Sequence, residues 1–174
     1  MTSIIKVDQI QNAAGGVPTA ADLGLNVSGT VVQVVTSRPV GATTFSSGSY
    51  TDATGFSVSI TPKFSNSLIL INITAQTSMN NTSAGAGQDY RLLRNATDVV
   101  SAQWQNYLNG SDYSADYYPP FVLSQQDTPA TTSTVVYKLQ GRLYGGASAA
   151  WVINDYNGGG GGSYGCMTVT EIAQ

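Results

Sequence analysis

The chain contains no histidine and a single cysteine, Cys166, among its 174 residues. Without histidine it cannot build a Ser-His-Asp triad, a Cys-His pair or an imidazole site for zinc. One cysteine cannot form a thiolate cluster or an internal disulfide. We therefore expect no catalytic residue, no cofactor and no metal site.

Charge is also scarce, since only 10% of the residues are charged and glutamate occurs once, at Glu171. The net charge is −3, and the seven Lys and Arg residues are scattered, whereas a nucleic-acid-binding domain usually carries a basic patch. Long apolar runs are missing as well: the longest, LILINI at 68–73, is too short to cross a bilayer. Asp8 interrupts any apolar core of a signal peptide. We expect neither nucleic-acid binding nor membrane insertion.

Two features could still suggest an enzyme. Asp112 and Asp116, in NGSDYSADYY, are the candidates for the carboxylate pair of a glycan-cleaving site. The alternative, which we prefer, is that they are solvated loop carboxylates that favour turns. The glycine run YNGGGGGS at 156–163 lacks the Gly-Lys-Ser/Thr and the following helix of a phosphate-binding loop. The sequence favours a protein that is not an enzyme.

What the chain has in place of Lys and Glu is Thr, Ser, Gly and Asn, which are poor helix formers. Alternating apolar and polar residues predict half-buried strands, most clearly at 55–61, where Phe56, Val58 and Ile60 share one side. The apolar segment 68–77 is predicted to be the central strand, and 89–95 with 98–104 a hairpin. The other predicted strands are 30–37, 121–126, 133–144, 149–155 and 164–172.

This pattern predicts an all-β fold, an antiparallel β-sandwich whose strand number suits a jelly roll. The opening 28 residues are short of such strands and contain Gly15, Gly16 and Pro18. We therefore predict an extended N-terminal arm and linker at 1–28, followed by one globular domain at 29–174.

Several segments resemble a known family. IIKVDQIQNAAGG resembles the opening of short fibre-like structural proteins of tailed bacteriophages, especially those of marine and cyanobacterial hosts. YTDATGFSVSITPKFSNSLILI is similar to the first half of the domain that those proteins carry, and STVVYKLQGRL with GCMTVTEIAQ is similar to its end. Their closing strand is matched here by Met167, Val169, Glu171 and Ile172.

The resemblance implies a virion protein, assembled in the host bacterial cytoplasm, with a TNF/C1q-like jelly roll that forms a homotrimer. One location is the tail or baseplate, where the protein would be a short tail fibre that binds the host receptor. The alternative is the capsid, where it would be a trimeric decoration (cement) protein whose arm staples capsid subunits. A chain without a long shaft of repeats is compatible with this second location.

The start of the arm is predicted to dock on another virion protein by adding a strand to a sheet edge. Ile5 and Val7 would point to one side of that strand, and Ile4 and Ile10 to the other. In a trimer, three arms would bind together and strengthen a weak contact. The alternative is that this segment is an edge strand of its own domain. The docking residues are Ile4, Ile5, Lys6, Val7, Asp8 and Ile10.

The remaining candidates are aromatic. The segment 104–120 mixes tyrosine with Asn, Ser and Asp, a composition typical of binding loops and suited to a bacterial surface glycan. The alternative is a loop that packs over the sandwich. Its candidate receptor contacts are Trp104, Tyr107, Tyr113, Tyr117 and Tyr118. The candidates for the trimer interface are Tyr137, Tyr144, Tyr156 and Tyr164, and the alternative is that they belong to the core, where Trp151 in particular is expected.

Overall fold

The computed structural model describes residue 11 and residues 15–17, 28–80, 86–108, 118–145, 150–155 and 165–174; at 80, 86 and 104–108 it describes the backbone alone. Within these residues every regular element is a β-strand. Accordingly, this part of the chain has no helix that is long and apolar enough to cross a membrane. The all-β class predicted from the composition is confirmed.

Ten strands make up the described part of the domain. They are β1 (Val31–Ser37), β2 (Thr43–Phe45), β3 (Thr51–Ile60), β4 (Leu68–Asn80), β5 (Ala86–Arg94), β6 (Thr97–Leu108), β7 (Pro120–Asp127), β8 (Val135–Tyr144), β9 (Ala150–Ile153) and β10 (Cys166–Ile172).

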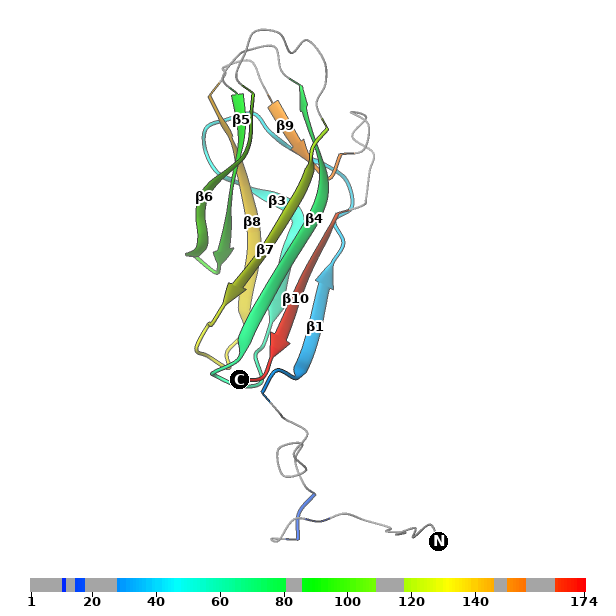
Figure 1. The fold of residues 1–174 in the computed structure, drawn as a ribbon, viewed down its shortest axis with the longest axis vertical. Coiled ribbons are helices and arrows are strands. Elements are labelled where there is room, and N and C mark those ends of the chain that lie inside the picture. The colour runs from blue at the N-terminus through cyan, green and yellow to red at the C-terminus, as the bar shows by residue number, and fades with distance from the viewer. Residues whose placement is uncertain are drawn as a thin grey trace, which may run out of the picture.

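The strands form two antiparallel sheets that pack face to face (Figure 1). The six-stranded sheet has the order β1-β10-β4-β9-β2, with β7 also paired to β4; the four-stranded sheet has the order β3-β8-β5-β6. From β3 to β8 the chain passes repeatedly between the two sheets, as in a jelly roll. The predicted sandwich is confirmed, and so is the central place of β4, which pairs with β7, β9 and β10.

Alternation along the strands decides which side chains form the core. In β3, Phe56, Val58 and Ile60 are buried while Ser57 and Ser59 are exposed, as predicted. Burying one such apolar side chain contributes about 1.5–3 kcal/mol, so the inward orientation of each strand is strongly determined. The largest fully buried side chains are Trp151, Tyr137, Phe45, Phe56, Phe121, Ile69, Ile71, Ile73, Met79, Leu92, Leu139 and Ile153.

Strand β2 was not predicted, because three residues are too few to show alternation. It is held by its neighbour β9, since Phe45 lies opposite Trp151 and their ring centroids are 4.3 Å apart. The indole Nε1 of Trp151 also donates a 2.7 Å hydrogen bond to the carbonyl of Arg142. Contacts between distant parts of the chain therefore create this strand.

Strand β3 begins at Thr51, earlier than the predicted start at 55. Gly55 lies inside the strand with a φ of +80°, and the pairing with β8 shifts register between Asp52 and Ser57. A Cβ atom at Gly55 would come within 2.8 Å of the Cα of Pro39. The glycine therefore allows a close approach of two backbones and a bulge, where the sequence had indicated the beginning of the strand.

The chain enters the domain beside its C-terminal strand. The amide of Gly29 donates to the carbonyl of Ala173 (2.8 Å), and the amide of Ala173 donates to the carbonyl of Thr30 (3.0 Å). We call this end of the sandwich the entry end. The predicted arm, residues 1–28, lies almost entirely outside the described residues and stays a prediction.

Candidate interaction surface

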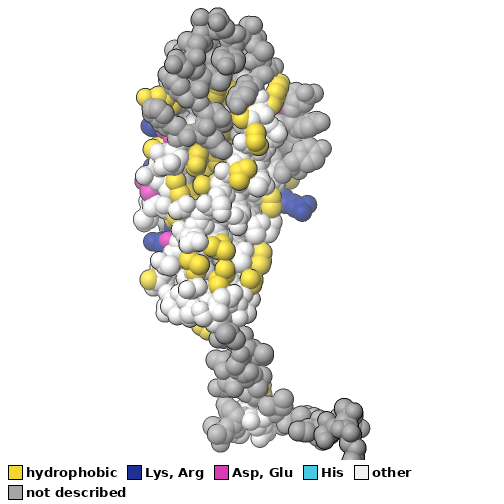
Figure 2. Space-filling view, in the orientation of Figure 1, with side chains coloured by type: hydrophobic (Ala, Val, Ile, Leu, Met, Phe, Trp, Pro, Cys, Tyr) yellow, Lys and Arg dark blue, Asp and Glu magenta, His cyan; other side chains and the backbone are white. Residues whose placement is uncertain are grey.

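The outward side of β1, β10, β4 and β7 presents a row of side chains without charge. We call these positions the uncharged face. They are Val34, Thr36, Leu68, Leu70, Asn72, Thr74, Pro120, Val122, Ser124, Gln126, Cys166, Thr168, Thr170 and Ile172. Figure 2 shows this side of the molecule: hydrophobic and uncharged side chains occupy its middle, and the visible Lys, Arg, Asp and Glu side chains lie at its margins.

The composition of this face is unusual for a surface in water. The exposed surface of a small soluble domain typically carries about 25–35% charged residues, whereas depletion of charge marks the core of a protein interface. Val122 and Val34 are 60% and 55% exposed here. Many of these outward positions hold β-branched residues, which are favoured in strands. A partner cannot bind this surface through ion pairs, because its outward positions carry no charge.

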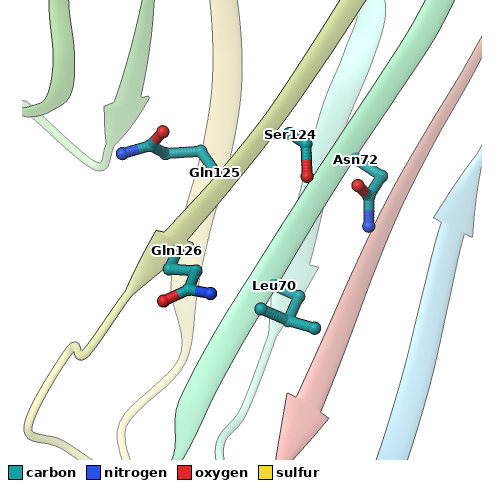
Figure 3. A pocket seen from close by; sticks show the side chains of 5 residues that line it. All are labelled: Leu70, Asn72, Ser124, Gln125 and Gln126. Carbon is teal, nitrogen blue, oxygen red and sulfur yellow. The ribbon is translucent and has the colours of Figure 1, made fainter.

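The face is shallow. Between β4 and β7 it has a depression of about 480 Å³, and no charged or aromatic side chain lines it (Figure 3). The lining residues are Leu70, Asn72, Ser124, Gln125 and Gln126. Polar groups on the face also contact one another, since the hydroxyl oxygens of Thr36 and Thr168 are 3.3 Å apart. Such a surface is suited to a broad protein contact and offers little to a small ligand.

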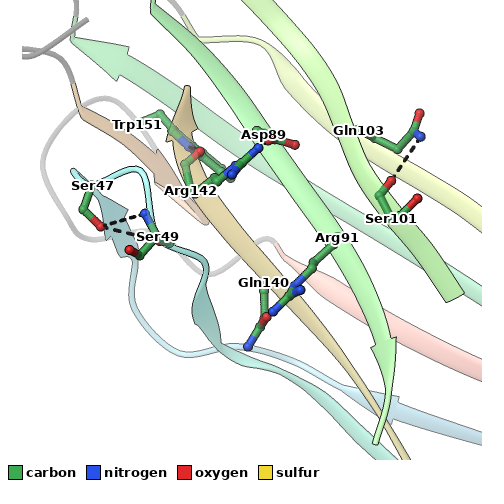
Figure 4. Close-up of polar contacts among 9 residues, drawn as sticks. All are labelled: Ser47, Ser49, Asp89, Arg91, Ser101, Gln103, Gln140, Arg142 and Trp151. Carbon is green, nitrogen blue, oxygen red and sulfur yellow. Dashed lines mark hydrogen bonds and ion pairs between the residues drawn. The ribbon is translucent and has the colours of Figure 1, made fainter. Parts of the chain in front are cut away.

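The outward side of the four-stranded sheet has the opposite chemistry. Lys138 on β8 pairs with Asp52 on β3 at 3.1 Å, and the guanidinium of Arg142 donates to Asp89 at 2.6 Å. Asp89 is fully buried beneath this cover. Figure 4 shows Arg142 and Arg91 reaching across neighbouring strands toward Asp89 and Gln140. These charges find their partners within the same chain, so this side is suited to contact with water.

Tyr50, in the loop after β2, packs against the outward side of the four-stranded sheet. Arg91 and Arg142 both lie over its ring, each guanidinium 4.5 Å from the ring centroid. Burial and the neighbouring Asp89 carboxylate raise the pKa of Tyr50 to about 12. The phenol therefore stays neutral at physiological pH, and the cluster braces the sheet. In the part of the chain that the structure describes, no group of three or more His, Cys, Asp or Glu residues could hold a metal ion.

The structure places only some of the predicted site residues. Trp104 and Tyr107 lie on β6, where the backbone alone is described, opposite Asp89 and Gly87 of β5. Tyr118 is 36% exposed and lies two residues before the start of β7. The following predicted residues lie outside the described residues: Ile4, Ile5, Lys6, Val7, Asp8, Ile10, Asp112, Tyr113, Asp116, Tyr117, Tyr156 and Tyr164.

Of the two predicted interface tyrosines that the structure describes, one is in the core. Tyr137 is fully buried, and its hydroxyl donates a 2.6 Å hydrogen bond to Asp127. Because it has no exposed surface, Tyr137 belongs to the core, and its assignment to a trimer interface was wrong. Tyr144, at the end of β8, is 36% exposed. The uncharged face, which the sequence reasoning missed, could have been noticed as the lack of charge at alternate positions of 68–74, 120–126 and 166–172.

No protein-family model and no curated protein matches the chain. Among solved structures, dimeric latent PorU from Porphyromonas gingivalis is 10% identical over 84% of this chain and 13% of its own length, with a TM-score of 0.46. A structure of infectious bursal disease virus, Gt strain, is 16% identical over 84% of this chain and 38% of its own, with a TM-score of 0.38. The VP2 subviral particle of that virus is 16% identical over 81% and 37%, with a TM-score of 0.36. This chain spans well under two thirds of each of these proteins, and the similarity says nothing about its function.

Proposed function

We propose that this protein is a non-enzymatic structural protein of a tailed-bacteriophage virion, a short tail fibre that binds the host surface. Its arm, residues 1–28, docks on the tail or baseplate. Its jelly-roll domain forms a homotrimeric head, held together through the uncharged face, and presents its far end to the host. The sequence resemblance of both ends of the chain supports the proposal, together with the chemistry and the polarity of the domain.

The uncharged face carries the proposal. A monomeric domain gains solubility from charge on both outer sides, yet here the outward ion pairs of the described strands lie on the four-stranded sheet, and the outward positions of β1, β10, β4 and β7 hold no charge. Two copies that meet through such a face lose no ionic hydration, because no charge is buried. A second and a third copy of the same chain are therefore suitable occupants.

The two ends of the domain are also arranged as a fibre head requires. The chain enters beside Ala173, and β10 pairs Glu171 with Ile69 at the start of β4. The start of β7 lies at the other end (Figure 1), where Pro120 pairs with Gln76 and the side-chain amide of Gln76 donates to the carbonyl of Tyr118 (2.7 Å). The root of the arm and the border of the proposed receptor loop thus lie at opposite ends, so docking and host contact do not compete for space.

The location is tested by antibody-gold labelling of intact virions under the electron microscope. We expect label at the tail, and we expect deletion of residues 2–16 to leave a folded trimer that is absent from purified virions. Label spread over the head would overturn the tail-fibre proposal in favour of a capsid decoration protein. Normal incorporation of the shortened chain would contradict docking through the arm.

A further inference from the structure

The two long edges of the sandwich differ in how far side chains bridge the space between the two sheets. Along β1 and β3, side chains join the sheets: the amide of Gln33 donates to the carbonyl of Thr61 (2.8 Å), and the hydroxyl of Ser37 donates to the carbonyl of Gly55 (2.6 Å). Along β6 and β7, a groove of about 350 Å³ lies between the sheets. We call it the lateral groove.

Both polar and apolar side chains line this groove, and the polar ones are Ser101, Gln103 and Gln125. Tyr90, Val99 and Val100 are half-buried and pack against the core from outside, and Leu123 of β7 lies across from them. The ring of Tyr90 meets Phe121 edge-on, with centroids 5.0 Å apart. Most of the exposed lining is polar, so a segment that covers the groove would be held mainly by hydrogen bonds to a strand edge, and burial of these few apolar side chains, at about 25 cal/mol per Å², would add to them.

The strand beside the groove is able to accept another strand. Within the described residues, β7 pairs with β4 alone, in continuous register from Asp127 to Pro120. Natural edge strands are usually protected by charges, prolines or bulges, and residues 121–126 of β7 contain no charge and no proline. The other border, β6, shows register shifts against β5, which makes β7 the better template.

We propose that residues 4–10 of the same chain add to this second edge of β7 and cover the lateral groove in the unassembled protein. The segment IIKVDQI alternates, so Ile5 and Val7 would share the groove side with Gln9. The side chains of Ile5 and Val7 match Leu123 and Val100, while Lys6 and Asp8 turn to the outer side together with Ile4 and Ile10. The sequence left open whether this segment pairs within its own domain; the groove supplies the place.

The chain is long enough for this contact. Residue 28 lies at the entry end, and β7 also ends there, since Asp127 pairs with Ile69. Residues 11–27 span up to about 56 Å at roughly 3.3 Å per residue, whereas β4, the longest strand, spans only about 43 Å. A tether of this length holds the segment near the groove at an effective concentration that a separate molecule in dilute solution does not reach.

Disulfide trapping in the full-length chain tests the proposal. In a Cys166→Ser background, Lys6→Cys is combined with Ser124→Cys on β7 or, as matched control, with Val34→Cys on β1, the opposite edge strand of the same sheet. We expect an intrachain disulfide with Ser124→Cys to form at least tenfold faster than with Val34→Cys under mild oxidation. Equal rates, no intrachain product, or only interchain dimers would overturn the proposal.

Hydrogen exchange provides a second, independent readout. The double variant Ile5→Asp, Val7→Asp should increase deuterium uptake several-fold in peptides of β7, and leave β4 and β10 unchanged as evidence of an intact fold. Unchanged uptake in β7 would overturn the proposal. Both experiments use purified protein, and their outcomes do not depend on the proposed function. That function adds one consequence, namely that the segment must leave β7 before it docks on the virion.

Discussion

Glu171, the single glutamate of the chain, organises the entry end of the domain. Its carboxylate is fully buried, and Oε1 accepts hydrogen bonds from the hydroxyl of Ser67 (2.6 Å) and the amide of Lys63 (2.7 Å), while Oε2 accepts one from Gln33. Burial raises the pKa of Glu171, but these hydrogen bonds outweigh it and hold the pKa below its ordinary value of 4.5. The residue thereby fastens the β3–β4 loop to β10.

Replacing this carboxylate tests its role. Glu171→Gln should lower the free energy of unfolding by about 2 kcal/mol, because several buried donors lose a charged acceptor. Urea denaturation measures the change. Asp98→Asn is the matched control: its carboxylate is 43% exposed and pairs with Arg91 at 3.7 Å, so the loss should stay below about 0.5 kcal/mol. Equal losses in the two variants would contradict this role of Glu171.

The same residue predicts a dependence of stability on pH. Because the pKa is lowered in the folded state, the unfolded chain binds the proton more readily, and the stabilisation is fully present above pH 4.5. It should be lost as the pH falls through the folded pKa. Denaturation at a series of pH values from 7 downward should show this decline in the wild type and a shallower one in Glu171→Gln. Parallel curves would rule out Glu171 as the source.

At the scale of elements, the short strand β2 depends on a glycine in another sheet. A Cβ at Gly141 of β8 would lie 2.6 Å from Trp151 and 2.8 Å from Phe45, closer than real contacts allow. The absence of a side chain on β8 therefore makes room for the ring pair that joins β2 to β9. Strand, glycine and ring pair form one packing unit.

Gly141→Ala should accordingly destabilise the domain by about 1–3 kcal/mol, the usual cost of overpacking a core. Gly48→Ala is the control, because a Cβ there has only the carbonyl oxygen of Leu143 at 4.0 Å. Thermal unfolding of the two variants, followed by the near-ultraviolet circular dichroism of the buried tryptophan, measures the difference. A Gly141→Ala variant as stable as the control would mean that the ring pair shifts without cost.

At the scale of the whole molecule, the domain has two outer sides of different chemistry, one with ion pairs and one without charge at its outward positions. This asymmetry predicts how copies of the chain meet. It places self-association on the six-stranded sheet and leaves the four-stranded sheet in water. The interface candidates Tyr144, Tyr156 and Tyr164 are not required by this arrangement.

A charge introduced on each outer side of the domain shows which of the two sides mediates self-association. Val122→Glu, on the uncharged face, should convert the expected trimer to monomers, because a carboxylate buried without a partner costs several kcal/mol. Ser57→Glu, on the outward side of β3, should leave the trimer intact. Light scattering after size-exclusion chromatography gives the mass of each. A monomeric wild type, or dissociation of both variants alike, would refute self-association through this face.

Much of the fold could be predicted because alternation is a local signal. The segments that became β3 and β8 each show which residues turn inward without reference to any other strand, whereas the apolar run of β4 indicated only a central strand. Strand β2 and the early start of β3 could not be predicted, since Phe45 is ordered by Trp151 and Gly55 by Pro39, residues far away in the sequence. The candidate surface could not be recognised from aromatic residues either, because an absence of charge marks it.

The sequence by itself determined the all-β class, the inward side of the clearly alternating strands β3 and β8, and the exclusion of histidine chemistry and thiolate clusters, because each depends on residue types or on neighbours two positions apart. Only the tertiary structure decided that Tyr137 belongs to the core, where Asp127 accepts its hydrogen bond, and that the charge-free positions of four strands form one face. Thr36 and Thr168 meet on that face although 132 positions separate them. The physical reason is that strand pairing joins distant segments and is driven by burial of the whole core. The sequence of a single segment therefore does not indicate which strand it pairs with.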